Sequence, residues 1–165
     1  MKLLQALCER LTARLPVQRI SGHDGSTYLE RYTLLNLGPT RGRVYLHRFL
    51  RGDEDRELHN HPWYAISLIL VAGYLEERRR WTPEGDRVDV RRYRPGRFNV
   101  LAPHTFHRVE LDRGPCWTLI ATGPVVQSWG FWDRATGRYL PWREFVRAKG
   151  VVPRGEATVA GADAP

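Results

Sequence analysis

The first residues of the chain carry leucines at helical spacing. An α-helix turns once every 3.6 residues, so the spacing predicts a helix over residues 2–15 with one apolar face. Pro16 ends this helix, because the residue before a proline disfavours helical backbone angles. We expect the apolar face either to pack against the rest of the chain or to form a dimer contact. Its residues are Leu3, Leu4, Leu7, Leu11 and Leu15.

From residue 28 the pattern changes to that of β-strands, with short apolar or alternating runs separated by turns. Many short strands without helices between them indicate an antiparallel sandwich or barrel. A small barrel of this kind can hold one ligand in its mouth. Besides the strand that carries His59 and His61, strands are predicted at residues 28–35, 43–50, 63–74, 75–81, 87–93, 98–101, 107–110, 117–121 and 125–132.

The C-terminal part of the chain predicts a short helix and a tail. Pro141 suits the first turn of a helix, which we expect over residues 141–149. Residues 153–165 are mostly Ala, Gly, Pro and Val, a composition typical of a flexible tail. We therefore expect one domain over residues 1–152, with the barrel at about 28–132.

Composition and charge limit the kinds of partner that the protein can bind. The chain has 165 residues, 42% of them apolar, as expected of one globular domain. Its formal net charge is +8. Only Lys2 and Lys149 are lysines, and the arginines are scattered among acids without a basic helix. The charge therefore indicates a small anionic substrate or partner, and nucleic acid is the least favoured partner.

Two cysteines, Cys8 and Cys116, are too few for a disulfide framework, which fits a reducing cytoplasm. Glu9 and Arg10 interrupt the apolar start of the chain before it reaches the length of a signal peptide. No apolar run approaches the length of a membrane span, so a cytoplasmic protein without a membrane partner is expected.

The candidate chemistry lies in two groups of histidines, at residues 58–63 and 104–107. Side chains two apart on a strand share a face, so His59 and His61 can converge on one point. His107, from another strand, would supply a third imidazole. Three neutral imidazoles suit iron, zinc, copper or nickel. The alternative is that these are structural or surface histidines.

These residues resemble two motifs of the cupin superfamily. His59, His61 and Gly73 match the first motif, G-x5-H-x-H followed by Glu and Gly, and Gly96 and His107 match the second. The resemblance covers roughly residues 43–121. It implies an all-β double-stranded β-helix, a jelly-roll barrel flanked here by the N-terminal and C-terminal helices, and a homodimer.

The chain departs from the motifs at several positions. Ile66 stands where the first motif has its metal-binding Glu, and Gly52 is displaced by one from the opening glycine. In the second motif Ala102, His104 and Leu111 replace Pro, Gly and Asn. The resemblance therefore implies a site of three histidines without an acid, as in thiol dioxygenases of the cysteine dioxygenase type and some diketone-cleaving enzymes. A three-histidine site with an open position also suits zinc.

A fourth ligand or an outer partner of the metal could come from outside the motifs. His47 lies on the preceding strand, and His104 would need a β-bulge to face the site. Tyr64 could place a phenol near the metal as a hydrogen-bond donor, or pack in the core. Asp55, like Asp53, stands near the site entrance or forms a solvated acidic turn.

An arginine could bind an anionic substrate, because a guanidinium binds a carboxylate through two hydrogen bonds. Arg48 is the preferred candidate, since it leads into the turn beside the site, and Arg43 and Arg108 are further candidates. Each could equally be a surface residue.

Taken together, these features predict a metal-dependent cupin. The first hypothesis is a mononuclear non-haem iron(II) oxygenase for a small carboxylate or amino-acid-like substrate, with one divalent metal for which zinc, manganese or nickel are alternatives. The second is a non-catalytic binding or sensing cupin. The third is a zinc- or manganese-dependent isomerase or hydrolase.

Overall fold

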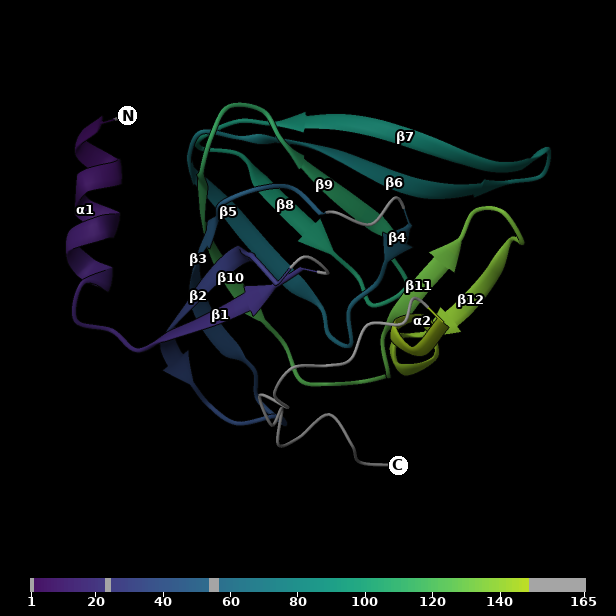
Figure 1. Cartoon of the computed structure of the whole chain (residues 1–165), viewed down its shortest axis with the longest axis horizontal. Coiled ribbons are helices and arrows are strands. Elements are labelled where there is room, and N and C mark those ends of the chain that lie inside the picture. The colour runs from purple at the N-terminus through teal and green to yellow at the C-terminus, as the bar shows by residue number, and fades with distance from the viewer. Residues whose placement is uncertain (1, 23–24, 54–56, 149–165) are drawn as a thin grey trace.

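The computed structural model describes residues 2–22, 25–53 and 57–148, and its strands form two six-stranded antiparallel sheets that face each other (Figure 1). The first sheet has the order β1-β2-β3-β10-β5-β8. Its strands are β1 (Val17–Ser21), β2 (Thr27–Asn36), β3 (Arg43–Phe49), β10 (Cys116–Thr122), β5 (Ala65–Val71) and β8 (Phe98–Leu101).

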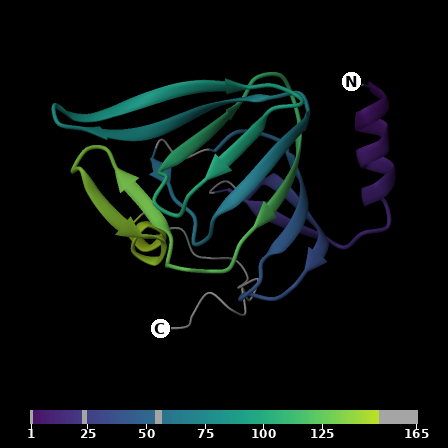
Figure 2. The same cartoon turned by 180° about the vertical axis from the view of Figure 1, so that it is seen from behind.

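The second sheet has the order β12-β11-β4-β9-β6-β7. Its two longest strands, β6 and β7, form a hairpin that projects from the barrel, as the view from behind shows (Figure 2). Its strands are β12 (Arg138–Pro141), β11 (Gly130–Asp133), β4 (Leu58–His59), β9 (His107–Leu111), β6 (Tyr74–Thr82) and β7 (Gly85–Tyr93).

The interior of the barrel is built by the alternation of side chains along the strands. In β5 every second residue is buried, so one face of this strand lines the interior. Two buried clusters fill the barrel between the sheets. One contains Tyr45, Ala65, Leu101 and Ile120, and the other contains Ile69, Tyr74, Val109 and Cys116. The predicted all-β barrel with a short helix at each end is confirmed.

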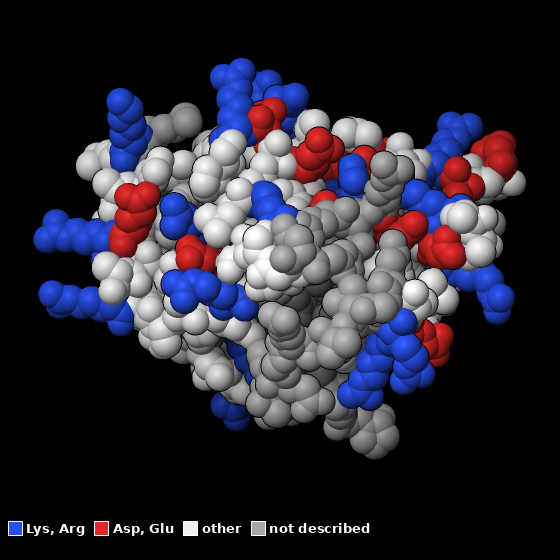
Figure 3. All heavy atoms as spheres, viewed as in Figure 1, with Lys and Arg blue, Asp and Glu red and all other residues white. Residues whose placement is uncertain are grey.

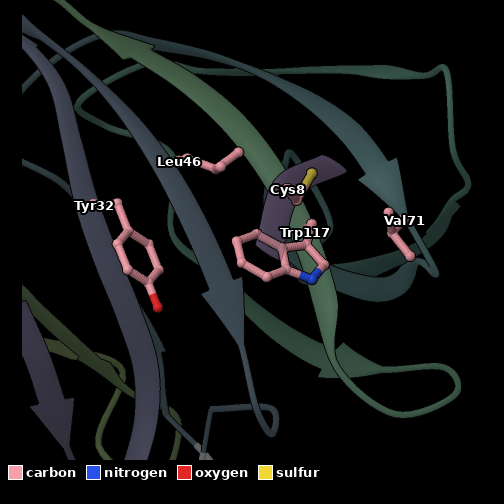
Figure 4. Packing of buried hydrophobic residues seen from close by; sticks show 5 residues of the cluster. All are labelled: Cys8, Tyr32, Leu46, Val71 and Trp117. Atoms are coloured by element: carbon pink, nitrogen blue, oxygen red, sulfur yellow. The ribbon is translucent and has the colours of Figure 1, made fainter. Parts of the chain in front are cut away.

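Helix α1 (Lys2–Thr12) packs on the outside of the first sheet through Cys8. Figure 4 shows Cys8 with Trp117 and the other members of this outer cluster, which are Tyr32, Leu46 and Val71. Of the predicted leucine face, Leu15 packs against this cluster, whereas Leu3, Leu7 and Leu11 are 85%, 50% and 57% exposed. Packing of the leucine face against the sheet is therefore confirmed only at Leu15, and the homodimer stays a prediction.

Several element boundaries differ from the sequence-based prediction. Strands β1 and β12 were not predicted, and β11 begins only at Gly130. The long apolar run over residues 63–74 is split by Ala72, which has a φ of 60°, and by Gly73, where a Cβ would lie 2.4 Å from the carbonyl oxygen of Tyr93. A side chain at position 73 would clash with backbone, so this turn requires glycine.

The N-terminal helix is shorter than predicted, and the C-terminal helix lies where it was predicted. Helix α1 ends at Thr12, whose hydroxyl donates to the carbonyl oxygen of Cys8 at 2.9 Å. Helix α2 (Trp142–Ala148) begins directly after Pro141. The predicted tail at residues 153–165 lies outside the described residues.

Charged side chains are mixed on the surface. On the face drawn in Figure 3, basic side chains spread around the rim with acidic side chains between them. Within the described part of the chain, neither helix has the length and apolar character needed to cross a membrane.

Candidate metal centre

Three histidines converge on the inner side of the second sheet. His59 on β4 and His107 on β9 lie directly opposite each other in the sheet, so their side chains share a face. Nε2 of His61 lies 2.9 Å from Nε2 of His107. One nitrogen from each of the three rings lies within 4.8 Å of the others. The structure thus brings together the three predicted metal ligands.

His61 reaches this cluster from a loop. Strand β4 ends at His59, so the predicted continuation of the strand through His61 is wrong. The buried Asn60 fixes the loop instead, since its amide donates to the carbonyl oxygen of Pro103 at 3.0 Å and accepts from the backbone of Gly130 at 2.8 Å. The ring of His61 also stacks on Trp63 with centroids 4.4 Å apart.

Glu76 on β6 supports His107 from behind. Its carboxylate lies 2.8 Å from Nδ1 of His107, and the residue is fully buried. Burial alone would raise the pKa of Glu76, but hydrogen bonds from His107, Arg78 and Asn99 outweigh it and lower the pKa to about 2. The ionised carboxylate accepts the Nδ1 proton, which leaves Nε2 of His107 as the nitrogen that faces the cluster.

The same carboxylate is held by a closed network of polar side chains. Arg78 donates to Glu76 at 2.5 Å and also bonds Asn99. The amide of Asn99 donates to Glu76 and to the hydroxyl of Tyr74, each at 2.9 Å. Every charge on this wall therefore has a partner within the protein.

His59 lies beside Asp53 and Phe131. Its Nδ1 is 4.0 Å from Asp53, whose carboxylate accepts from the backbone of Val109 at 2.6 Å. The ring of Phe131 lies 6.2 Å from that of His59, centroid to centroid. Asp53 thus lies beside His59, and the predicted Asp55 lies outside the described residues.

The donor set fits a divalent transition metal. Burial lowers the pKa of His61 well below its usual value, and the charges of the other two histidines, Arg31 and His47 lower it further. A neutral imidazole offers a lone pair to a metal. One ring nitrogen of each of the three histidines lies within 4.8 Å of the others, so the three can serve as donors to a single ion.

The other predicted ligands do not join the cluster. His47 is buried, but its Nε2 accepts a hydrogen bond from Nε of Arg31 at 3.2 Å. His104 is exposed in a turn, and Tyr64 is 56% exposed. The predicted roles of His104 and Tyr64 at the metal are therefore not supported by their positions.

The three predicted arginines take different places. Arg48 pairs with Glu30 at 3.3 Å and stacks over Trp117 on the outer face of the first sheet. Arg108 pairs with Glu77 at 3.0 Å, on the face of β9 opposite to that of His107. Arg43 has the same strand parity as His47, which faces inward. The outward positions of Arg48 and Arg108 do not support their predicted substrate role.

Three inward-facing residues were missed from the sequence: Glu76, Asn99 and Arg31. Glu76 had one signal, because Tyr74, Glu76 and Arg78 alternate on one face of a strand that follows the turn at Gly73. Arg31 had none, since its position beside His47 depends on the register between β2 and β3.

Comparison with known proteins agrees with the fold. No protein-family model and no curated protein matches the chain. Among solved structures, the chain is similar to a cupin-2 domain protein from Rhodospirillum rubrum, with 12% identity and a TM-score of 0.56 over 81% of this chain and 82% of that one.

Two further solved structures are similar over part of their length. One is the iron(II) form of HppE with an alternative substrate, at 12% identity and a TM-score of 0.51. The other is the DMSP lyase DddQ from Ruegeria pomeroyi, at 18% identity and a TM-score of 0.50. Each match covers 67% of this chain but only 56% and 57% of the other chain. These similarities establish the cupin fold.

Proposed function

We propose that the three histidines bind one divalent metal, iron(II), and that the protein is a mononuclear non-haem iron(II) oxygenase for a small carboxylate or amino-acid-like substrate. The observation that carries the proposal is the convergence of His59, His61 and His107, with their nitrogens within 4.8 Å. Bound iron(II) would supply the binding and reduction of dioxygen, with coordination positions left open by only three protein ligands.

The residues around the histidines support this role. Glu76 keeps the proton of His107 on Nδ1, so that Nε2 stays available. Trp63 stacks on His61, and Phe131 lies beside His59. Aromatic rings thus pack against two of the three histidines. The similar HppE structure is described as containing iron(II), which adds support for this ion.

Metal content tests the first part of the proposal. Protein purified without chelator, then supplied with iron(II) under anaerobic conditions, is expected to hold nearly one iron per chain by mass spectrometry. A His59→Ala/His107→Ala double variant should lose this metal. The matched control is His104→Ala, because His104 is exposed and outside the cluster. Failure of the wild type to bind any metal would overturn the proposal.

Oxygen consumption tests the second part. An oxygen electrode should record uptake that depends on iron and on a member of a panel of small carboxylates and amino acids, and the double variant should show none. Preference for zinc, without oxygen uptake, would instead favour the isomerase or hydrolase hypothesis. Metal binding without turnover of any kind would favour a sensing module.

A further inference from the structure

Arg31 lies on the inner face of the first sheet, beside His47. The two residues are directly opposite each other in the pairing of β2 with β3, so their side chains share a face. Nε of Arg31 donates to Nε2 of His47 at 3.2 Å. The guanidinium carbon lies 5.0 Å from the centre of the Tyr45 ring, which belongs to the barrel interior.

The positive charge of Arg31 has no acidic partner among the described residues. Its contacts there are the neutral groups His47 and Tyr45, and no bond of the described chain uses its two terminal amino groups. Other arginines differ: Arg48 pairs with Glu30 and Arg78 pairs with Glu76. Arg31 is half-buried, so its terminal amino groups can meet an anion that arrives from outside, and a guanidinium partly withdrawn from water without a counter-ion gains from such a partner.

Arg43 lies on the same face of β3 as Tyr45 and His47, because residues two apart on a strand share a face. Nε of Arg43 donates to the neutral amide oxygen of Asn36 at 3.1 Å. Arg43 thus adds a second positive charge to the inner face of this strand.

Arg31 and the histidine cluster share one interior. Trp63 connects them, because it stacks on His61 and packs against the buried cluster that contains Tyr45. Arg31 in turn lies over the ring of Tyr45. The charges of Arg31 and His47 also contribute to the lowered pKa of His61.

We propose that Arg31 binds the acidic group of the substrate, a carboxylate or phosphonate, through its two terminal amino groups, with Arg43 as a second cation. His47 is a positioning residue, since it accepts the Nε hydrogen bond and fixes the plane of the guanidinium. The opposite end of the substrate then faces the three histidines. This inference deepens the proposed function and rests on it for the reaction, while the anion site can be tested without metal.

The test is a titration with acetate and, separately, with methylphosphonate, followed by two-dimensional NMR of the backbone and arginine Nε–H groups. Both metal-free and zinc-loaded protein are used. The wild type should show saturable shifts at Arg31 in both forms. Arg31→Gln should weaken the binding at least about tenfold, the loss expected for one charge-assisted hydrogen-bonded pair. Arg31→Lys keeps the charge without the planar fork and should fall between the two.

Control variants distinguish anion binding at Arg31 from anion binding elsewhere on the protein. Arg48→Gln removes an arginine of the outer face and should leave binding unchanged. His47→Gln keeps a hydrogen-bond acceptor and should retain binding, whereas His47→Leu should lose it. Urea unfolding of each variant confirms that it folds.

Three results would overturn the inference. The first is absence of saturable shifts in both forms of the wild type, and the second is unchanged affinity in Arg31→Gln. The third is anion binding only in the zinc-loaded form, lost in the His59→Ala/His107→Ala variant, because it would assign the anion to the metal. If the wild type binds no metal at all, the proposed oxygenase fails, and the metal-free titration still decides the role of Arg31.

Discussion

The inner faces of the two sheets differ in whether their charged side chains have partners of opposite charge. On the second sheet, Glu76, Arg78 and His107 are linked into one network in which each charge has a partner. On the first sheet, Arg31 and His47 face the interior without a carboxylate among the described residues. Removing one partner of a buried ion pair is strongly destabilising, whereas an uncompensated cation can gain a counter-ion from a ligand. The comparison therefore separates an inner face whose charges are paired within the protein from one whose cation, Arg31, we propose meets the substrate.

The largest effect is expected from removing the Glu76 carboxylate from the network on the second sheet. Glu76→Ala leaves Arg78, whose side chain is 12% exposed, without its partner. We expect the free energy of unfolding of the metal-free protein to fall by about 3–5 kcal/mol in urea titrations. Glu110→Ala is the control, because Glu110 is 66% exposed and should cost at most about 1 kcal/mol. Equal losses in the two variants would contradict the network.

A milder substitution at Glu76 tests whether its charge contributes to metal affinity. Glu76→Gln keeps a polar group next to Nδ1 of His107 but removes the negative charge. We expect zinc affinity, measured by competition with a chelating dye, to fall about 10- to 100-fold. Unchanged affinity would show that Glu76 serves stability alone.

The pH dependence of stability tests the environment of His47 on the inner face of the first sheet. Burial and the charge of Arg31 lower the pKa of His47 well below its usual value, and Tyr45, Phe49 and Thr118 also surround this ring or lie opposite it. In the unfolded chain His47 is protonated below about pH 6.5, whereas in the native state it stays neutral. Acidification below about pH 6.5 therefore favours the unfolded state and destabilises the fold.

This contribution is about 1.4 kcal/mol per pH unit below pH 6.5 for one histidine. His61 contributes in the same direction, so the test compares the wild type with His47→Gln in urea titrations at pH 7.0 and 5.5. The variant should lose less stability than the wild type over this interval. Identical losses would show that His47 is protonated in the native state.

The smallest effect is expected from Arg31. Arg31→Met removes a cation that no described carboxylate compensates, so the metal-free protein should stay within about 1 kcal/mol of the wild type or become more stable in urea. A loss as large as that of Glu76→Ala would mean that Arg31 is structural, and the contrast between the two inner faces would disappear.

The fold and the three histidines could be predicted because their signals are local. The H-x-H spacing places His59 and His61 together, and the pattern of short strands indicates a barrel. The convergence of His59 and His61 was predicted from a shared strand face, whereas the structure brings His61 to the cluster from a loop after β4. Ile66 stands at the motif position of the Glu, and the residues that the described cluster brings together are His59, His61 and His107.

The arginines show where sequence reasoning fails. Arg48 and Arg108 each follow an inward-facing histidine directly in a strand, so they point outward, and this alternation was available in the sequence. Arg31 and Glu76 reach the interior from other strands. Their neighbours are decided by strand register, which is set by pairing across the sheet and cannot be read from one strand.

Strand β10 carries a consequence for how the protein opens. Cys116 and its neighbour Trp117 face opposite sides of this strand, Cys116 within the barrel and Trp117 against Cys8 of helix α1. Burial raises the pKa of both thiols, to about 12 for Cys116, so neither reacts while it stays covered. The rate at which a thiol reagent modifies Cys8 would thus report how often the helix detaches. The rate at which it modifies Cys116 would report how often the barrel opens.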